Sequence, residues 1–459
     1  MSNDEDFKPL EEETTKRVIF SNEFGTDGNY KRVNVITQNT LKAGENALKI
    51  IEVSPFDPPS PIEEIPHSSP IVKHVRTRYP DEFLSDLCNE GLLNAMLSEK
   101  NNVSGMLEKL CKHGLIERYS NILPMHRERL AREMQIINQK EYAGGFLIIH
   151  DFVKYARSRN ILISPGCGAL PGSLVAYCLG ITGVDPVKEN LIFERYLNME
   201  RETFFYGIRI DVEKGAKALI FDYLSEKYGR GMPILLEMAG IHINESVELS
   251  IIKETIENVT KETGKVIDIS AIDHNDKVVL EQFLICEIKP GSMDELMALI
   301  SLDRPLPKEY VASYLHNKAD PQSISYECPD MEFILGSTYG CLIYQEQVMW
   351  ILQALGGFSP DQSDLCRRDL SKREYCFNSE RRRQFVEGAV ATGHGIFTTR
   401  IDEDTANAIY DRLCEDAPCC FNKAHVAAYS LMIYEIAWLK YYYGTEFQKV
   451  VEKYKRDQV

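Results

Sequence analysis

Residues 166–173 read G-C-G-A-L-P-G-S and form the first pattern that could do chemistry. Gly166, Gly168 and Gly172 follow a short apolar run, and Ser173 begins a segment with helical character. Glycines between a strand and a helix let backbone N–H groups approach a phosphate. Phosphate loops usually add a cation or a hydroxyl, and the cysteine between the first two glycines supplies neither. The pattern therefore fits either a nucleotide-binding loop or a tight turn that serves packing.

A second pattern is a basic stretch late in the chain. Arg367 and Arg368 are followed by Lys372, Arg373 and the triplet at 381–383. Guanidinium groups bind phosphates well, so this stretch could contact a nucleotide or a nucleic-acid backbone. Charge runs are more often a solvated helix face, and both interpretations stay open here.

Three cysteines and a histidine near the C-terminus have the ligand types of a zinc site. They are Cys414, Cys419, Cys420 and His425. Structural zinc sites usually need well-spaced ligand pairs, and two adjacent cysteines fit that geometry poorly. We interpret these cysteines as buried or incidental thiols.

Composition limits the class of protein and the kind of partner. The chain has 459 residues, with 44% hydrophobic and 26% charged residues, which is typical of a globular protein of about three domains. Lys plus Arg number 52 and Asp plus Glu number 69, so the net charge is −17. An acidic chain is not a general polyanion binder, and any contact with nucleic acid needs a local basic surface.

The sequence also predicts the compartment. No apolar run approaches the ~20 residues that a membrane helix needs, so we expect no membrane contact. The first residues are acidic and polar and do not resemble a signal peptide. Twelve cysteines occur without a Cys-x-x-Cys pair, which predicts reduced thiols and a cytoplasmic location.

The periodicity of apolar residues predicts an α+β fold that is predominantly helical. Residues 1–53 form an N-terminal extension with short β-rich runs, and the prolines of 54–79 predict a linker. Residues 80–160 are helical, with an amphipathic segment at 127–140. Residues 161–291 alternate apolar runs with helices and predict a small sheet. Residues 292–459 are mostly helical.

Several long motifs in the same order make the pattern specific to one family. Residues 172–177 read G-S-L-V-A-Y and residues 193–201 read F-E-R-Y-L-N-M-E-R. Residues 338–349 read T-Y-G-C-L-I-Y-Q-E-Q-V-M, and residues 421–429 read F-N-K-A-H-V-A-A-Y. Over roughly residues 80–459 the chain strongly resembles the bacterial DNA polymerase III alpha subunit, a C-family DNA polymerase.

The resemblance implies a fold and an activity. The fold would be a helical thumb at 80–160, a reduced palm at 161–291 and helical fingers at 292–459. The activity would be template-directed nucleotidyl transfer with two Mg²⁺ ions held by carboxylates. The implied nucleotide-binding residues are Gly166, Gly168, Gly172, Ser173, Arg367, Arg368, Lys423 and His425. Implied partners are a DNA primer-template and replisome proteins.

The metal site departs from the family pattern. The resemblance implies a D-x-D-x-D strand, whose three positions here are Gly207, Arg209 and Asp211. The two positions that the family uses as metal ligands match Gly207 and Arg209, and only the third carboxylate, Asp211, remains. Glu237 stands where a later metal-binding Asp is expected, and we expect Asp211 and Glu237 on neighbouring strands or strand ends. The palm segment between them is shorter than in the family. The glycine-rich loop has also lost the family's Arg and Ser, and Cys167 now stands in the place of the Arg.

The departures leave three hypotheses about function. The first is a catalytically inactive protein that binds DNA, nucleotide or replisome partners. The second is an active polymerase that uses Asp211, Glu237 and Glu213 as a substitute metal set, with Mg²⁺ as its cofactor. The third is an interaction module without a nucleic-acid role. We recognise no clamp-binding region, no region for a proofreading partner and no N-terminal His-x-His metal motif.

Overall fold

The computed structural model describes residues 100–201, 207–372, 379–391 and 400–456, together with the backbone of three N-terminal strands. The predicted linker at 54–79 and the first part of the predicted thumb, residues 80–99, lie outside the described residues.

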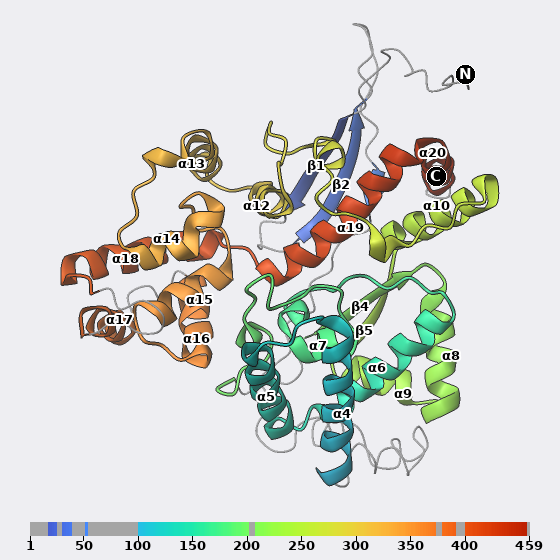
Figure 1. The fold of residues 1–459 in the computed structure, drawn as a ribbon, viewed down its shortest axis with the longest axis horizontal. Helices are drawn as coiled ribbons and strands as arrows, with labels where there is room; N and C mark the ends of the chain where they lie inside the picture. The colour runs from blue at the N-terminus through green and yellow to red at the C-terminus, as the bar shows by residue number, and fades with distance from the viewer. Residues whose placement is uncertain are drawn as a thin grey trace, which may run out of the picture.

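Helices make up most of the described chain (Figure 1). They are α4 (Lys100–Arg118), α5 (Pro124–Gln139), α6 (Ala143–Ser158), α7 (Leu174–Cys178), α8 (Ala216–Tyr228), α9 (Met232–Met238), α10 (Val247–Thr263), α11 (Lys277–Leu280), α12 (Met293–Leu302), α13 (Lys308–Ala319), α14 (Pro329–Leu335), α15 (Gln345–Ala354), α16 (Pro360–Ser371), α17 (Ser379–Ala391), α18 (Glu403–Asp416), α19 (Lys423–Tyr442) and α20 (Gly444–Arg456). The strands are β1 (Arg17–Phe24), β2 (Tyr30–Gln38), β3 (Ile51–Val53), β4 (Ile208–Glu213), β5 (Ile241–Ser246) and β6 (Phe283–Leu284). The prediction of a predominantly helical α+β fold is confirmed.

The N-terminal strands pair into a sheet of order β3-β2-β1-β6. β1 and β2 are antiparallel, whereas β6 joins β1 in parallel through residues 283 and 284. The β-rich runs predicted within residues 1–53 therefore form strands.

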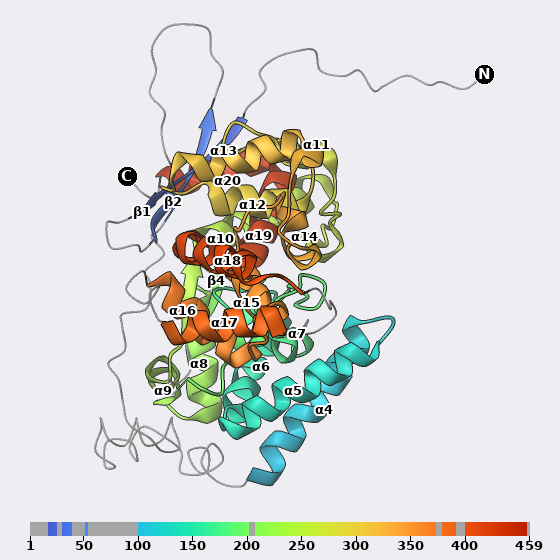
Figure 2. The same ribbon diagram turned by 90° about the vertical axis from the view of Figure 1, so that its left-hand side faces the viewer.

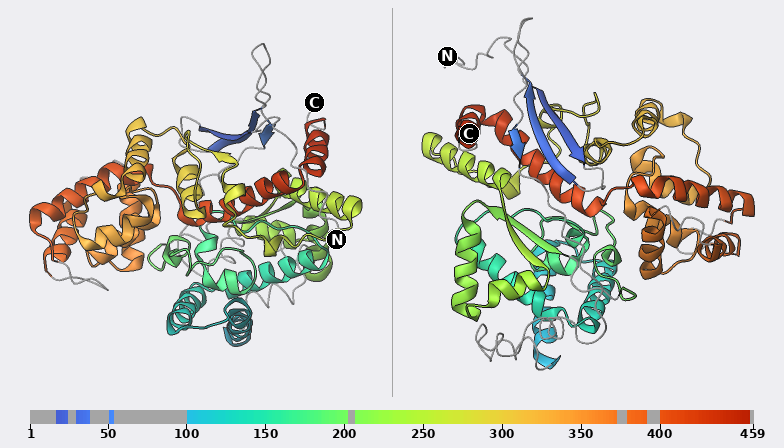
Figure 3. Two further views of the ribbon diagram at one scale, coloured as in Figure 1. Left: turned by 45° about the horizontal axis from the view of Figure 1, so that its top comes forward. Right: turned by 180° about the vertical axis from the view of Figure 1, so that it is seen from behind.

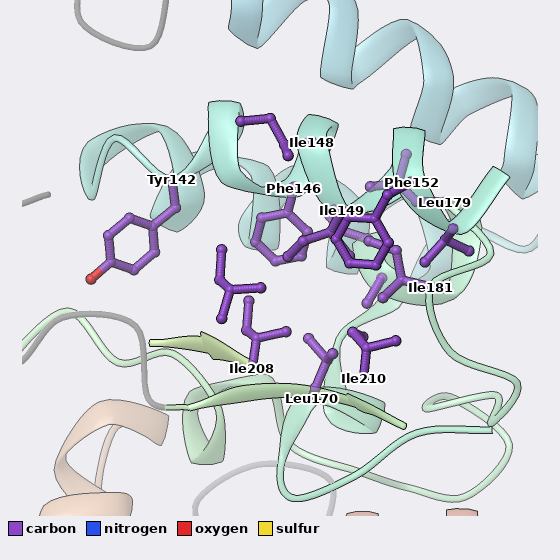
Figure 4. Packing of buried hydrophobic residues seen from close by; sticks show 14 of the residues in the cluster. Tyr142, Phe146, Ile148, Ile149, Phe152, Leu170, Leu179, Ile181, Ile208 and Ile210 are labelled. Carbon is purple, nitrogen blue, oxygen red and sulfur yellow. The ribbon is translucent and has the colours of Figure 1, made fainter. Parts of the chain in front are cut away.

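A two-stranded parallel sheet of β4 and β5 lies at the centre of the region predicted as the palm. Because side chains alternate along a strand, Ile208 and Ile210 point to one face, where they are buried. Figure 4 shows both side chains directed at Phe146 and Ile149 of α6. The residues between them must therefore face the other side of the sheet.

One apolar core joins the regions predicted as thumb and palm. Its buried members run from Leu107 in α4 to Ile243 in β5, so the expected boundary at residue 160 does not separate two cores. Helix α4 packs against α6 and α7, and α5 packs against α7, so the two helices cover one side of this core (Figure 2). The amphipathic segment predicted at 127–140 is confirmed, because Leu130, Met134 and Ile137 of α5 are buried.

The region predicted as fingers contributes to more than one core. Helices α14 to α18 pack into a lobe of their own (Figures 1 and 3). Helix α19 leaves this lobe and packs against α12 and α10, while α20 packs against α10 and α19. The N-terminal end of α19 thus reaches the glycine-rich loop from a distant part of the chain.

The short apolar run at 161–163, before the glycines, was expected to form a strand, but only Ile163 makes an isolated bridge, to Val212. The helix expected from Ser173 is confirmed as the short α7, which Ser173 caps. In the part of the chain that the structure describes, no helix is long and apolar enough to cross a membrane.

Candidate functional site

The polar face of the β4–β5 sheet gathers the residues that occupy the expected metal site. Arg209 and Asp211 project from β4, and their neighbours across the sheet are His242 and Asn244. The Nε atom of Arg209 lies 2.6 Å from Oδ1 of Asp211. Asp211 is only 7% exposed, and burial raises the pKa of its carboxyl, while Arg209 and the Asn244 amide partly offset that rise.

The glycine-rich loop lies against this face. Gly166 and Gly168 have φ values of +143° and +62°, which strain any other residue, so the loop needs glycine at both positions. The N–H of Gly168 donates to Nδ1 of His425 at 3.2 Å. The first residues of α19 therefore meet the loop beside the sheet.

His425 and Cys167 do not form a nucleophilic pair. Burial and the nearby Arg209 lower the pKa of His425 to about 4, so its imidazole is neutral and accepts the Gly168 hydrogen bond. The Sγ atom of Cys167 is 4.0 Å from Nδ1 of His425, and burial raises the pKa of that thiol to about 12. A protonated thiol is a poor nucleophile, so the site offers no Cys–His chemistry at neutral pH.

Ser173 and Gly172 serve packing. The hydroxyl of Ser173 donates to Oε2 of Glu133 at 2.9 Å, and the backbone N–H of Leu174 donates to Oε1 at 2.9 Å. Gly172 packs so closely on Ile192 that an added Cβ would lie 3.1 Å from its carbonyl oxygen. The hydrogen-bond donors at the start of α7, which a bound phosphate would need, therefore already donate to the carboxylate of Glu133.

Glu237 does not lie on a strand, contrary to expectation. It stands in the last turn of α9, ahead of β5, and its carboxylate binds Lys217 of α8 at 3.1 Å. Glu237 and Asp211 therefore form ion pairs with different cations, Lys217 and Arg209. Glu213, the further member of the substitute metal set, is 3.9 Å from Lys253.

These residues do not fit a divalent metal ion. Hard cations need several oxygen ligands around one point. Gly207 offers no side chain, and Arg209 offers a positive charge without a lone pair. Among the described residues, no group of three or more His, Cys, Asp or Glu could hold a metal.

A second cluster brings four arginines around one buried carboxylate. Asp364 of α16 accepts hydrogen bonds from Arg367 at 2.9 Å and Arg368 at 3.0 Å, and Arg201 lies 3.0 Å away. Arg195 interacts with the same group electrostatically. These charges hold the pKa of Asp364 below its usual value against the effect of burial.

Among the described residues, this cluster holds four guanidinium groups and two carboxylates, Asp364 and Glu346. Burial and the nearby Arg367 lower the pKa of Arg195 to about 9. Arg367 is 4% exposed, and its Nε atom is buried without a hydrogen-bond partner in the described structure. Sequence analysis had found Arg367 and Arg368 but had missed Arg195 and Arg201, although both lie in the motif at 193–201 that carried the resemblance.

Lys423 lies at the edge of this cluster. Its backbone N–H donates to Oε2 of Glu346 at 2.8 Å, and its Nζ atom donates to the carbonyl of Glu189 at 2.7 Å. Glu346 also interacts with Arg195, so Lys423 and the arginine cluster share a carboxylate. The structure therefore brings Lys423 near the arginines but places His425 at the polar face.

The arginine triplet at 381–383 is paired with carboxylates. Arg383 pairs with Glu380 and Glu387, and Arg382 pairs with Asp411. This arrangement is that of a solvated helix face. Arg373 lies outside the described residues.

The comparisons with known proteins agree on one family. Residues 105–279 match the model of the bacterial DNA polymerase III alpha NTPase domain, and residues 282–393 match that of the bacterial DNA polymerase III alpha subunit finger domain. The chain is 26% identical to DNA polymerase III subunit alpha of Staphylococcus aureus (strain COL), over 70% of this chain and 42% of that protein. It is 26% identical to DNA polymerase III subunit alpha of Halalkalibacterium halodurans, over 74% of this chain and 42% of that protein. The chain thus spans less than half the length of these relatives.

Proposed function

The chain is a bacterial DNA polymerase III alpha-like protein, and we propose that it binds phosphate-bearing partners of replication, DNA or nucleotide, without catalysing nucleotidyl transfer. The observation that carries the proposal is the arginine cluster around Asp364. Four guanidinium groups from two separate parts of the chain meet there around one carboxylate.

Phosphate is the chemistry that such a cluster suits. Guanidinium groups make paired, charge-assisted hydrogen bonds to phosphate oxygens. Arg368 keeps 25% of its side chain exposed, and Lys423 is also partly exposed, so these two groups are accessible to an incoming anion. The concentration of positive charge is notable because the whole chain carries a net charge of −17.

Loss of catalysis is the second part of the proposal. Two-metal transfer stabilises both the attacking and the leaving oxygen, so it depends on clustered carboxylates. Asp211 forms an ion pair with Arg209, and Glu237 forms a separate one with Lys217. Two carboxylates held in separate ion pairs do not support a catalytic metal site. We further propose a cytoplasmic location and contact with replisome proteins, both by analogy with the family alone.

Two assays on the full chain test this proposal. Primer extension with Mg²⁺ or Mn²⁺ should give no product. Fluorescence anisotropy should detect weak binding of labelled primer-template DNA or of a nucleoside triphosphate that weakens as salt rises. Incorporation that disappears in Asp211→Asn would favour the active polymerase instead. No retention of either ligand at low salt would favour the interaction module, because electrostatic binding is strongest there.

A further inference from the structure

We infer that the Arg209 guanidinium is a resident cation at the polar face of the β4–β5 sheet, where it balances the site's carboxylates in place of a divalent metal ion and keeps such an ion out. The inference rests on the family assignment in the proposed function but not on DNA or nucleotide binding.

The position of Arg209 is the first argument. Residues two apart on a strand share a face, so Arg209 and Asp211 lie side by side at the second and third positions of the family's D-x-D-x-D strand, and Arg209 stands at a position that the family uses as a metal ligand. The distance of 2.6 Å between Nε and Oδ1 is short for a charge-assisted hydrogen bond and indicates a close ion pair. A metal bound to the same carboxylate would lie within a few ångströms of the guanidinium and would be repelled by it.

The surroundings of the pair are the second argument. Glu248, in the first turn of α10, accepts a hydrogen bond from the Ser246 hydroxyl at 2.6 Å and interacts electrostatically with both Arg209 and Asp211. Among the described residues, His242, His425 and Cys167 also lie near Arg209; burial lowers the pKa of both imidazoles and raises that of the thiol, so none of them adds negative charge near neutral pH. Within the described structure, one guanidinium group therefore interacts with two carboxylates, Asp211 and Glu248.

If Arg209 keeps metal ions out, the carboxylates around it should still be able to bind a metal ion once its charge is removed. Removing the cation alone should uncover two neighbouring carboxylates at once. The face should then lose stability and gain an affinity for divalent ions that the wild-type chain lacks. Removing Asp211 as well should cancel most of both effects.

The test measures thermal unfolding and Mn²⁺ binding of the full chain in the wild type, Arg209→Met and the Arg209→Met/Asp211→Asn double variant. The wild type should show the same Tm in MnCl₂ as in NaCl of equal ionic strength. Arg209→Met should lower the Tm by roughly 5–10 °C, because it leaves a buried carboxylate unpaired. Millimolar Mn²⁺ should restore part of that loss, and electron paramagnetic resonance should show bound Mn²⁺. The double variant should recover stability without Mn²⁺.

Two controls keep the inference falsifiable. Lys217→Met breaks the more exposed pair with Glu237 and should shift the Tm only slightly. If Arg209→Met does not fold, Arg209→Lys keeps the charge and should fold without binding Mn²⁺. The inference fails if the wild type binds one Mn²⁺ that Asp211→Asn abolishes, if Arg209→Lys binds Mn²⁺, or if Arg209→Met is as stable as the wild type. None of these measurements uses nucleic acid, so a failure here is distinct from a failure of DNA binding.

Discussion

The polar face of the β4–β5 sheet and the arginine cluster around Asp364 are both rich in charge, but they balance it differently. At the sheet, Arg209 pairs with Asp211, and Glu248 adds a second carboxylate. At the cluster, four guanidinium groups interact with Asp364, and Glu346 adds a second carboxylate near Arg195. Among the described residues, carboxylates therefore outnumber the guanidinium group at the sheet, whereas guanidinium groups outnumber carboxylates at the cluster. An anion is repelled by the first arrangement and stabilises the second.

The largest effect should come from Asp364→Ala. The change leaves several buried arginines facing one another, and breaking a buried charge network by removing one partner costs about 3–5 kcal/mol. Urea unfolding should therefore show a free energy of unfolding lower by about that amount. Inorganic phosphate at millimolar concentration should restore part of the loss in the variant, because it supplies the missing negative charge. A variant as stable as the wild type would mean that the cluster is not held by Asp364.

The stability that Asp364 contributes should depend on pH. The pKa of Asp364 is lowered in the folded protein, so its contribution to stability is present above the unfolded value of about 3.9 and is lost as pH falls below it. The stability difference between the wild type and Asp364→Ala should therefore be constant near neutral pH. It should shrink below about pH 4 when unfolding is measured there.

A smaller, pH-dependent effect should come from His425→Gln at the polar face. The folded pKa of His425 is about 4, below its unfolded value of about 6.5, so the unfolded chain binds more protons between these values. Stability carried by His425 is thus present above pH 6.5 and is lost as pH falls towards 4. Glutamine can still accept from Gly168 but does not titrate. Between pH 7.5 and 5.0 the wild type should lose about 1–2 kcal/mol more than the variant in urea unfolding, and equal losses would contradict this.

Sequence reasoning identified Arg209 and Asp211 through collinear motifs, but it did not identify His242, Asn244 or Glu248, which reach the polar face through strand pairing and packing. The alternation of Ile208 and Ile210 fixes which face of β4 carries Arg209 and Asp211. It placed Glu237 wrongly, because the helix α9 and its ion pair with Lys217 depend on packing against α8 rather than on spacing.

Contacts between residues that lie far apart in the sequence could not be predicted. Arg195 and Arg201 meet Asp364 only because residues 193–201 pack against α16. Likewise, Ser173 was predicted to bind nucleotide, yet the carboxylate that it contacts comes from Glu133 of α5. No periodicity along the chain reports such contacts. Charge balance is therefore a property of the folded arrangement and not of any one segment.

A modest effect on binding should come from Arg368→Ala, which sharpens the contrast between the two regions. Arg368 is the more exposed of the two fingers arginines, whereas Arg367 is buried and its loss would confuse binding with folding. Removing one phosphate contact should weaken DNA binding by roughly 3–10-fold at low salt and reduce the slope of log affinity against log salt by about 0.9. Anisotropy titrations at several salt concentrations measure both quantities. An unchanged affinity and slope would mean that the excess charge serves only the fold.

The smallest effect should come from Arg383→Ala, the matched control for Arg368→Ala. Arg383 belongs to the same basic stretch, but its side chain is 59% exposed and already pairs with Glu380 and Glu387. Exposed ion pairs contribute little, so the free energy of unfolding should change by less than about 0.5 kcal/mol. DNA affinity and its salt dependence should also stay within error, because two glutamates on α17 already neutralise the charge of this guanidinium group. If Arg383→Ala weakened binding as much as Arg368→Ala, binding would follow the number of basic residues rather than their balance. The arginine cluster around Asp364 would then not differ from the paired arginines of α17 in its ability to bind DNA.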